Sequence, residues 1–332
     1  MPNTDCDVVV VGAGVSGLTT AICLAEGGLQ VTVLAAVPPA ETTSSVAGAV
    51  WGPHLVETSA RTARWRRETL AVLRELAIDP STGVKIATGV LASRSGPVAE
   101  PLDWLPELGG ASPCFPADLP GGFSSGWRYA APLAHMPAHL GYLRARFENA
   151  GGTVEAATVA SLPGAARERG ARAAVNCTGT GARDLVPDPA VTPFRGQVVV
   201  AANPGISEFF IGLADSSRDL VYLFPHGDTV LLGGTEVAGD WNTEPDPAVA
   251  ERILADCTAA EPRLRGARIL AHRVGLRPFR PQIRLEAEPG PPGPLVVHNY
   301  GHGGAGITMS WGCARAAAGL VSAAMTGGGL ST

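Results

Sequence analysis

The hydrophobic residues near the N-terminus predict an alternation of strand and helix. Residues 6–11 are a near-continuous run of β-branched side chains, which is typical of a parallel strand buried on both faces. A helical pattern follows over residues 15–26 and stops at two glycines, and a second strand is expected at residues 31–34. The beginning of the chain therefore predicts a strand, a turn, a helix and a strand in close succession.

The same patterns predict further elements along the chain. Helices are expected at residues 61–79, 137–149, 247–260 and 308–325. A short strand is expected at residues 173–177, and strands alternate with turns over residues 195–240. Residues 36–60 are expected to form a loop, and residues 93–130 contain so many prolines and glycines that no order of elements is predicted for them.

Composition indicates a globular protein of roughly two domains. Hydrophobic residues make up 45% of the 332 residues, and the net charge is −5 with no basic block, so a nucleic-acid partner is not expected. There is no signal-peptide pattern, no peroxisomal C-terminal motif and no apolar run approaching the ~20 residues of a membrane span, so we expect a cytoplasmic protein without a membrane partner. The six cysteines lack metal spacing, so we expect reduced thiols and no metal site.

Residues 12–17, Gly-Ala-Gly-Val-Ser-Gly, stand between the first strand and the first helix, where a dinucleotide-binding turn belongs. Gly12 allows a tight turn, Gly14 lets a pyrophosphate approach the backbone, and Gly17 lets the helix pack on the strand. The helix N-terminus offers free N–H groups to the phosphates. A tight turn that needs glycines for packing alone is the alternative explanation.

The usual acidic residue after the second strand is missing. Such a residue would hold a ribose hydroxyl, but the chain has Ala35, Ala36 and Val37 there. We therefore expect backbone groups to hold the adenosine end of the dinucleotide.

A second glycine-rich segment lies near the other end of the chain. Residues 298–308, His-Asn-Tyr-Gly-His-Gly-Gly-Ala-Gly-Ile-Thr, place four glycines within six residues ahead of a helix. A second helix N-terminus reached by a glycine loop is a second site for negative charge. A flavin needs two such sites, one for its pyrophosphate and one for its reduced ring, so the two segments together favour FAD. A plain glycine-rich connector is the alternative.

Three arginines recur in residues 275–284, Gly-Leu-Arg-Pro-Phe-Arg-Pro-Gln-Ile-Arg, where prolines restrict the backbone. An arginine held in this way is a good bidentate partner for a carboxylate, although a solvated basic loop is equally compatible with the pattern. Tyr222 stands at the end of an expected strand and could assist such a site or serve packing. His302 is expected to serve structure, and no residue is required as a general base.

Four segments together resemble the family of D-amino-acid oxidases and D-aspartate oxidases. They are residues 8–17, 42–53, 275–286 and 298–312. Weaker similarity links them at Asn176-Cys-Thr-Gly, Arg195-Gly-Gln, Gly233-Gly-Thr and Gly239-Asp-Trp-Asn. The motifs Gly-Leu-Arg-Pro-x-Arg-Pro and Asn-Tyr-Gly-His-Gly-Gly are the most specific, and the resemblance spans almost the whole chain.

The resemblance implies FAD bound non-covalently in an extended form. By motif match it implies these FAD-binding positions: Gly12, Ala13, Gly14, Val15, Ser16, Gly17, Thr42, Thr43, Ser44, Gly48, Ala49, Val50, Val159, Thr178, Gly303, Gly304, Gly306, Ile307 and Thr308. For the substrate it implies Arg277 and Tyr222 as a clamp for the carboxylate. It also implies the Gly304 carbonyl as the acceptor for the amino group.

The chain departs from the family pattern near the substrate. Many vertebrate members have a glutamine where this chain has Gly52, and a second active-site tyrosine in a longer loop where residues 216–220 are short. The D-aspartate oxidases have an arginine after Gly-Gly-Thr, where this chain has Glu236. We therefore expect neutral D-amino acids to be preferred, unless Arg218 supplies a replacement positive charge.

The expected architecture is an α/β fold in two interleaved domains. A FAD-binding Rossmann-like domain would use residues 1–60, 131–187 and 270–332. An α+β substrate-binding domain with a mixed or antiparallel sheet would use residues 61–130 and 188–269.

The resemblance implies oxidation of a D-amino acid to an imino acid, which hydrolyses to a 2-oxo acid and ammonia while oxygen is reduced to hydrogen peroxide. Three alternatives remain open: a D-aspartate oxidase, a flavin dehydrogenase with a different electron acceptor, and a non-catalytic dinucleotide sensor. Assembly into a homodimer is also left open.

Overall fold

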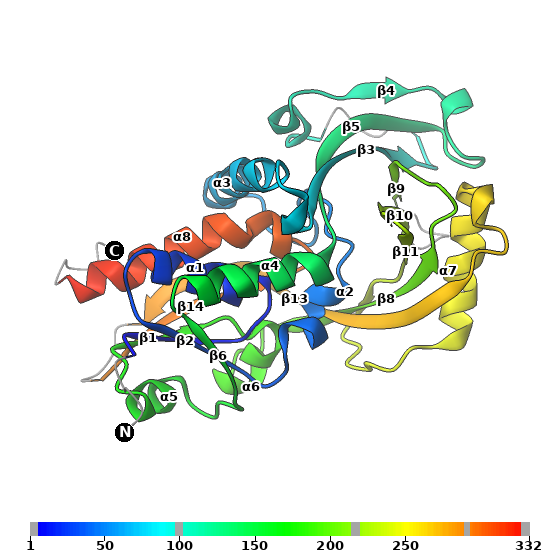
Figure 1. Cartoon of the computed structure of the whole chain (residues 1–332). Coiled ribbons are helices and arrows are strands. Elements are labelled where there is room, and N and C mark those ends of the chain that lie inside the picture. Colours follow the sequence, from blue (N-terminus) through cyan, green and yellow to red (C-terminus); the bar gives the residue numbers. More distant parts are fainter. Residues whose placement is uncertain (1–5, 97–101, 214–219, 289–292, 327–332) are drawn as a thin grey trace.

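The computed structural model describes residues 6–96, 102–213, 220–288 and 293–326 (Figure 1). Helices pack against one continuous mixed sheet, so the chain has the mixed α/β fold that the sequence predicts. The exact boundaries of the two interleaved domains stay a prediction, since the sheet runs through both of them.

Five parallel strands bring the two ends of the described chain together. In spatial order they are β14 (Leu295–His302), β7 (Ala173–Asn176), β1 (Val8–Val11), β2 (Val31–Ala35) and β6 (Thr153–Ala156). All four β1 residues are buried, as a strand covered on both faces requires. Only β7 separates β1 from β14, so residues near the N-terminus and the C-terminus reach the same edge of the sheet.

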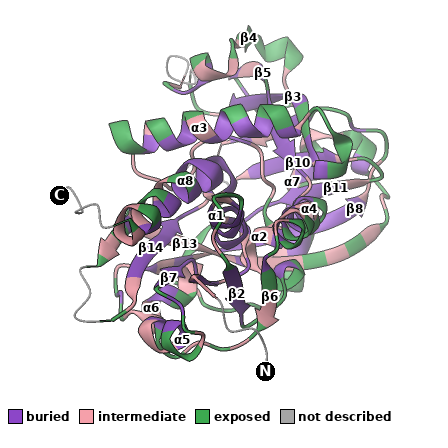
Figure 2. Ribbon diagram, turned by 60° about the vertical axis from the view of Figure 1, so that its left-hand side comes forward, coloured by how far each residue is buried: buried purple, intermediate pink, exposed green. Residues whose placement is uncertain are grey.

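Helices cover both faces of these strands. The helices α1 (Val15–Glu26), α4 (Met136–Asn149) and α8 (Gly306–Met325) lie on one face, and α5 (Leu162–Glu168) lies on the other. Val8 and Val10 join the core beneath α1 and α8, whereas Val9 and Val11 pack with α5, because side chains alternate along a strand. Figure 2 shows that α1 and α8 are mostly buried.

The rest of the sheet is largely antiparallel. From β14 outwards it contains β13 (Ile269–Glu288), β8 (Thr192–Ala202), β11 (Thr229–Gly233), β10 (Val221–His226), β9 (Phe209–Gly212), β3 (Val84–Ser93), β5 (Ser125–Ala134) and β4 (Ser112–Cys114), while β12 (Val237–Ala238) pairs with β8. Only β3 and β9 pair in parallel in this part. Val221 and Leu223 pack with residues of α7 (Pro247–Ala260), whereas Tyr222 and Phe224 point to the opposite face.

The predicted elements are confirmed with small shifts at their ends. The helices expected at residues 15–26 and 247–260 have these bounds in the structure. The helix expected at residues 61–79 is α3 (Ala60–Leu76), which a capping box of Ser59 and Thr62 starts, and α8 begins two residues before the expected position.

Two expectations need correction. Residues 36–60 contain the short helices η1 (Pro39–Glu41) and α2 (Thr43–Val46), so they are not a simple loop. The arginines of residues 275–284 lie on the long strand β13, so the solvated-loop alternative is wrong.

The remaining short helices lie in connections. They are η2 (Pro80–Thr82), η3 (Leu105–Leu108), η4 (Pro116–Asp118), η5 (Gly179–Gly181), α6 (Ala182–Leu185) and η6 (Pro262–Leu264). Within the described parts of the chain, no helix combines the length and apolarity that crossing a membrane requires.

We expect Gly17→Ala to destabilise the fold. A Cβ at Gly17 would overlap the Gly12 carbonyl oxygen and stand 2.9 Å from its carbon, and both belong to rigid backbone. Overpacking of this kind costs about 1–3 kcal/mol of unfolding free energy. The control is Gly319→Ala on α8, where a Cβ meets nothing within 4 Å, so helix propensity should raise stability by up to ~1 kcal/mol. Urea unfolding measures both, and equal midpoints for the two variants would refute this packing account.

Candidate functional site

A cavity of about 1090 Å³ lies at the carboxyl ends of the parallel strands, where α/β sheets bind ligands. Its wall contains Val11 from β1, Ala35 from β2 and Cys177, the residue after β7. The concave face of the antiparallel strands closes it on the other side with Tyr222 and Phe224. The volume lies slightly above the roughly 300–1,000 Å³ that ligand sites span, which suits an extended cofactor together with a substrate.

All but two of the residues predicted to bind FAD line this cavity. The lining includes Gly12, Ala13, Gly14, Val15, Ser16, Thr42, Thr43, Ser44, Gly48, Ala49, Val50, Val159, Thr178, Gly303, Gly304, Gly306 and Ile307. Gly17 lies behind it against the Gly12 carbonyl, and the Thr308 hydroxyl donates to the Gly52 carbonyl at 2.9 Å. Gly17 and Thr308 thus shape the site from behind its wall.

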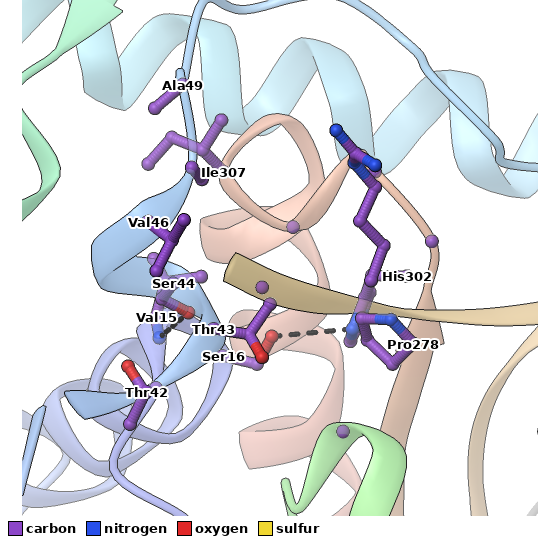
Figure 3. A pocket seen from close by; sticks show the side chains of 18 of the residues that line it. Val15, Ser16, Thr42, Thr43, Ser44, Val46, Ala49, Pro278, His302 and Ile307 are labelled. Atoms are coloured by element: carbon purple, nitrogen blue, oxygen red, sulfur yellow. Dashed lines mark hydrogen bonds between the residues drawn. The ribbon is translucent and has the colours of Figure 1, made fainter. Parts of the chain in front are cut away.

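The glycine turn before α1 leaves room for a phosphate. Gly12 has a φ of +109°, and a Cβ there would lie 2.5 Å from the Cys177 carbonyl oxygen, so only glycine fits. Gly14 precedes the helix and has no side chain to cap it, while the Val15 N–H donates to the Ser44 hydroxyl at 3.0 Å (Figure 3). Open N–H groups at a helix start attract an anion.

A second helix start faces the same cavity. Helix α8 follows Ala305, which makes no side-chain cap, and Gly304, Gly306 and Ile307 line the wall beside it. The Gly304 N–H donates to the His54 carbonyl at 3.1 Å, which fixes the glycine loop. Two uncapped helix starts in one cavity fit the two places where FAD carries negative charge, the pyrophosphate and the reduced ring.

Buried hydrogen bonds join these two helix starts. His302 accepts a bond from the Ser16 hydroxyl at 3.4 Å through Nδ1 and donates through Nε2 to Asn299 Oδ1 at 3.0 Å (Figure 3 shows the first). The Asn299 amide donates to the Thr20 hydroxyl at 3.0 Å. Burial lowers the pKa of His302 to about 4, so the ring is neutral near pH 7 and serves structure.

The adenosine end of the cavity contains one acidic residue that the sequence reasoning missed. Ala36, Val37 and Val159 line this end, and so does Glu41 of η1. A family pattern places the ribose acid directly after the second strand, and Glu41 stands six residues after Ala35, the last residue of β2. Its carboxylate is a candidate partner for a ribose hydroxyl.

Arg277 and Tyr222 come together on the concave face of the sheet. The Arg277 guanidinium donates to the Thr235 carbonyl at 3.1 Å and passes directly over Gly196, where a Cβ would lie 2.5 Å from Nη1. The Tyr222 ring lies against Gly233 in the same way. Burial raises the pKa of Tyr222 although the charge of Arg277 opposes this, so Tyr222 presents a neutral hydroxyl beside a cation.

Aromatic residues outside the predicted set form the wall near Tyr222. Trp51, Trp104 and Tyr129 line the cavity, and Trp104 makes edge contacts with the other two at centroid distances of 5.9 and 5.8 Å. Trp104 and Tyr129 lie in residues 93–130, where the sequence predicted no order of elements. Arg218 and the rest of residues 214–219 lie outside the described residues.

A hydrogen-bonded pair of side chains completes the wall. His54 Nε2 and Glu236 Oε2 are 2.7 Å apart, and both residues line the cavity. Among the described residues, no group of three or more His, Cys, Asp or Glu side chains could hold a metal ion.

The fold and cavity define a flavin-type α/β oxidoreductase, and comparisons with known proteins agree. The model of the DAO family, "FAD dependent oxidoreductase", matches residues 7–320. The chain is 49% identical over 318 residues to a D-amino-acid oxidase of Rubrobacter xylanophilus, with 96% of each chain covered. It is 35% identical over 328 residues to the human D-aspartate oxidase, covering 95% of this chain and 94% of that protein.

A solved structure of similar shape is the glycine oxidase of Bacillus cereus, with a TM-score of 0.80 at 18% identity, covering 96% of this chain and 95% of that one. The chain belongs to the FAD-dependent oxidoreductase family, as the resemblance of its motifs predicted. Its cofactor is FAD, and the two open helix starts and the glycine turns of the cavity fit that molecule.

The low pKa of His302 predicts acid destabilisation. Below pH 6.5 the unfolded chain binds a proton on this histidine, whereas the folded protein does not until about pH 4, so unfolding becomes easier as the pH falls. One such proton changes the unfolding free energy by about 1.4 kcal/mol per pH unit. Urea unfolding at pH 7, 6 and 5 with saturating FAD should show wild type losing more stability than His302→Gln, which keeps a donor and an acceptor. Parallel pH profiles would show that His302 does not carry this effect.

Proposed function

We propose that this protein oxidises D-amino acids to 2-oxo acids, ammonia and hydrogen peroxide. The observation that supports this most directly is the Arg277–Tyr222 pair, a cation and a neutral hydroxyl facing the cavity that also receives both helix starts. The Arg277 cation favours a substrate with a carboxylate. The names of two relatives, D-amino-acid oxidase and D-aspartate oxidase, favour a substrate that also has an amine. A cytoplasmic location remains a prediction of the sequence.

Each residue of the site has a distinct task in this proposal. Arg277 binds the substrate carboxylate through a charge-assisted pair of hydrogen bonds, and the Tyr222 hydroxyl donates a further bond to it. The Gly304 carbonyl accepts a hydrogen bond from the substrate amine. These three contacts fix the Cα–H bond in one direction, which is the main contribution a protein makes to a cofactor reaction.

When bound, FAD supplies the redox chemistry, because it accepts a hydride from Cα and passes two electrons to oxygen. The lone pair of the amine stabilises the cation left on Cα. If the amine binds in its neutral form, no side chain therefore has to remove a proton from Cα. His302, which lies among the glycines of residues 298–308, is buried, neutral and already bonded to Ser16 and Asn299, in keeping with this scheme. Water then hydrolyses the imino acid outside the clamp.

We expect neutral D-amino acids to be better substrates than D-aspartate. Glu236 lines the cavity, and its carboxylate repels a second carboxylate; two such charges ~5 Å apart interact by roughly 3 kcal/mol at an effective dielectric near 20. The paired His54 reduces this value, so we expect kcat/KM for D-aspartate to be at least ~10-fold below that for D-alanine, D-valine or D-phenylalanine.

A peroxide-coupled assay with these substrates and their L-enantiomers tests both the reaction and the preference. Turnover of D-alanine with stoichiometric hydrogen peroxide supports the proposed oxidase. Reduction of a dye without peroxide would identify a dehydrogenase, no turnover at all would leave the dinucleotide sensor, and D-aspartate ranking first would identify a D-aspartate oxidase and draw attention to Arg218.

Arg277→Ala should remove the carboxylate anchor. Charge-assisted bonds contribute about 1.5–3 kcal/mol, so kcat/KM for D-alanine should fall at least ~10-fold, while the FAD content stays near that of wild type. Arg144→Ala is the matched control, because Arg144 is exposed on α4 and, among the described residues, forms its ion pair with Glu148. Unchanged kcat/KM in Arg277→Ala would mean that the carboxylate binds elsewhere.

A further inference from the structure

The hydrogen-bonded pair of His54 and Glu236 lies on the wall of the cavity beside the proposed clamp. His54 belongs to the segment after Gly52, and Glu236 follows Thr235 between β11 and β12. Their side chains are 41% and 27% exposed, so both are reachable from solvent and both face the cavity. The proposed reaction gives His54 no task of its own and uses Glu236 only to disfavour acidic substrates.

Glu236 is the acidic neighbour of Arg277. The Thr235 carbonyl accepts a hydrogen bond from Arg277 at 3.1 Å, so the next residue along the chain begins beside the guanidinium. Burial raises the pKa of Glu236, but the bond to His54 and the charges of His54 and Arg277 outweigh burial and hold it below its usual range. An ionised carboxylate therefore lies within the electrostatic field of the clamp.

Arg277 itself has no carboxylate partner among the described residues. Its guanidinium donates to the neutral Thr235 carbonyl and lies beside the neutral Tyr222 hydroxyl. An unpaired guanidinium is what a substrate carboxylate needs, but the Glu236 side chain carries the same chemical group on the same wall. If the Glu236 side chain turned to Arg277, it would form the bidentate pair that the substrate carboxylate needs.

His54 is also tied to the glycine-rich segment before α8. Its carbonyl accepts the Gly304 N–H at 3.1 Å, and its ring lies so close to Gly304 that a Cβ there would overlap it. The backbone of His54 is therefore tied to the Gly304 loop, and its ring, which lies against Gly304, holds the Glu236 carboxylate through the 2.7 Å bond.

We propose that His54 is a positioning residue that keeps Glu236 away from Arg277 and so leaves the clamp open for the substrate carboxylate. This inference rests on the proposed function of Arg277. Without His54, Glu236 acts as an internal competitor. Competition raises the apparent KM and the Kd of carboxylate ligands, whereas kcat at saturating substrate changes little.

The test is a double-mutant cycle on the FAD-loaded protein. His54→Leu removes the bond to Glu236, and we expect KM for D-alanine and Kd for benzoate, measured by titration calorimetry, to rise at least tenfold. In His54→Leu/Glu236→Gln the competitor is gone, so both constants should return to within about threefold of the Glu236→Gln value. His54→Gln keeps a donor for Glu236 and should remain near wild type, and His272→Leu, at an exposed histidine on β13, controls for general effects.

The outcomes separate the inference from the function on which it rests. A merely structural role for His54 predicts a loss in His54→Leu that persists in the double variant, and that result would overturn the inference. An unchanged benzoate Kd in His54→Leu would overturn it as well. If wild type neither binds benzoate nor turns over D-alanine, the proposed function fails and the inference fails with it.

Discussion

A buried hydrogen-bond network holds the beginning and the end of the described chain together, and the shape of the cavity depends on it. Ser16 and Thr20 on α1 connect through His302 and Asn299 to the end of β14. Thr20, Asn299 and His302 are almost fully buried, where each of their polar atoms costs free energy unless it is paired. The network therefore favours one relative position of α1 and the glycine loop, and this position puts two helix starts into one cavity.

Glycines gather at the site where the backbone passes close to another group. Gly12 passes close to the Cys177 carbonyl, and Gly196 passes beneath the Arg277 guanidinium. Neither position has room for a Cβ. Because a glycine stands there, backbone or a charged side chain can lie closer to the bound ligand. The protein obtains binding geometry from the absence of side chains and adds few charges to the lining, those of Arg277, Glu236 and Glu41.

Local features of the fold could be predicted from sequence because they depend on nearby residues. The run of β-branched residues, the glycine turn and the helical period predicted the order of β1, α1 and β2. Their predicted bounds agree with the structure to within two residues. Most of the residues that the family motifs named likewise line the cavity. Arg277 and Tyr222, in contrast, lie on strands separated in the sheet by β8 and β11, so no spacing in the sequence could show their meeting. The pair of His54 and Glu236 depends on two loops 182 residues apart and was missed for the same reason.

The most direct measurement of the central claim is a crystal structure of the protein with FAD and benzoate. The account predicts the pyrophosphate against the N–H groups that follow Gly14, the flavin ring between Ala49 and Ile307, and the benzoate carboxylate on Arg277 and Tyr222. A flavin ring bound away from residues 303–307, or a carboxylate that leaves Arg277 untouched, would contradict the claim that the two ends of this chain form one flavin and substrate site.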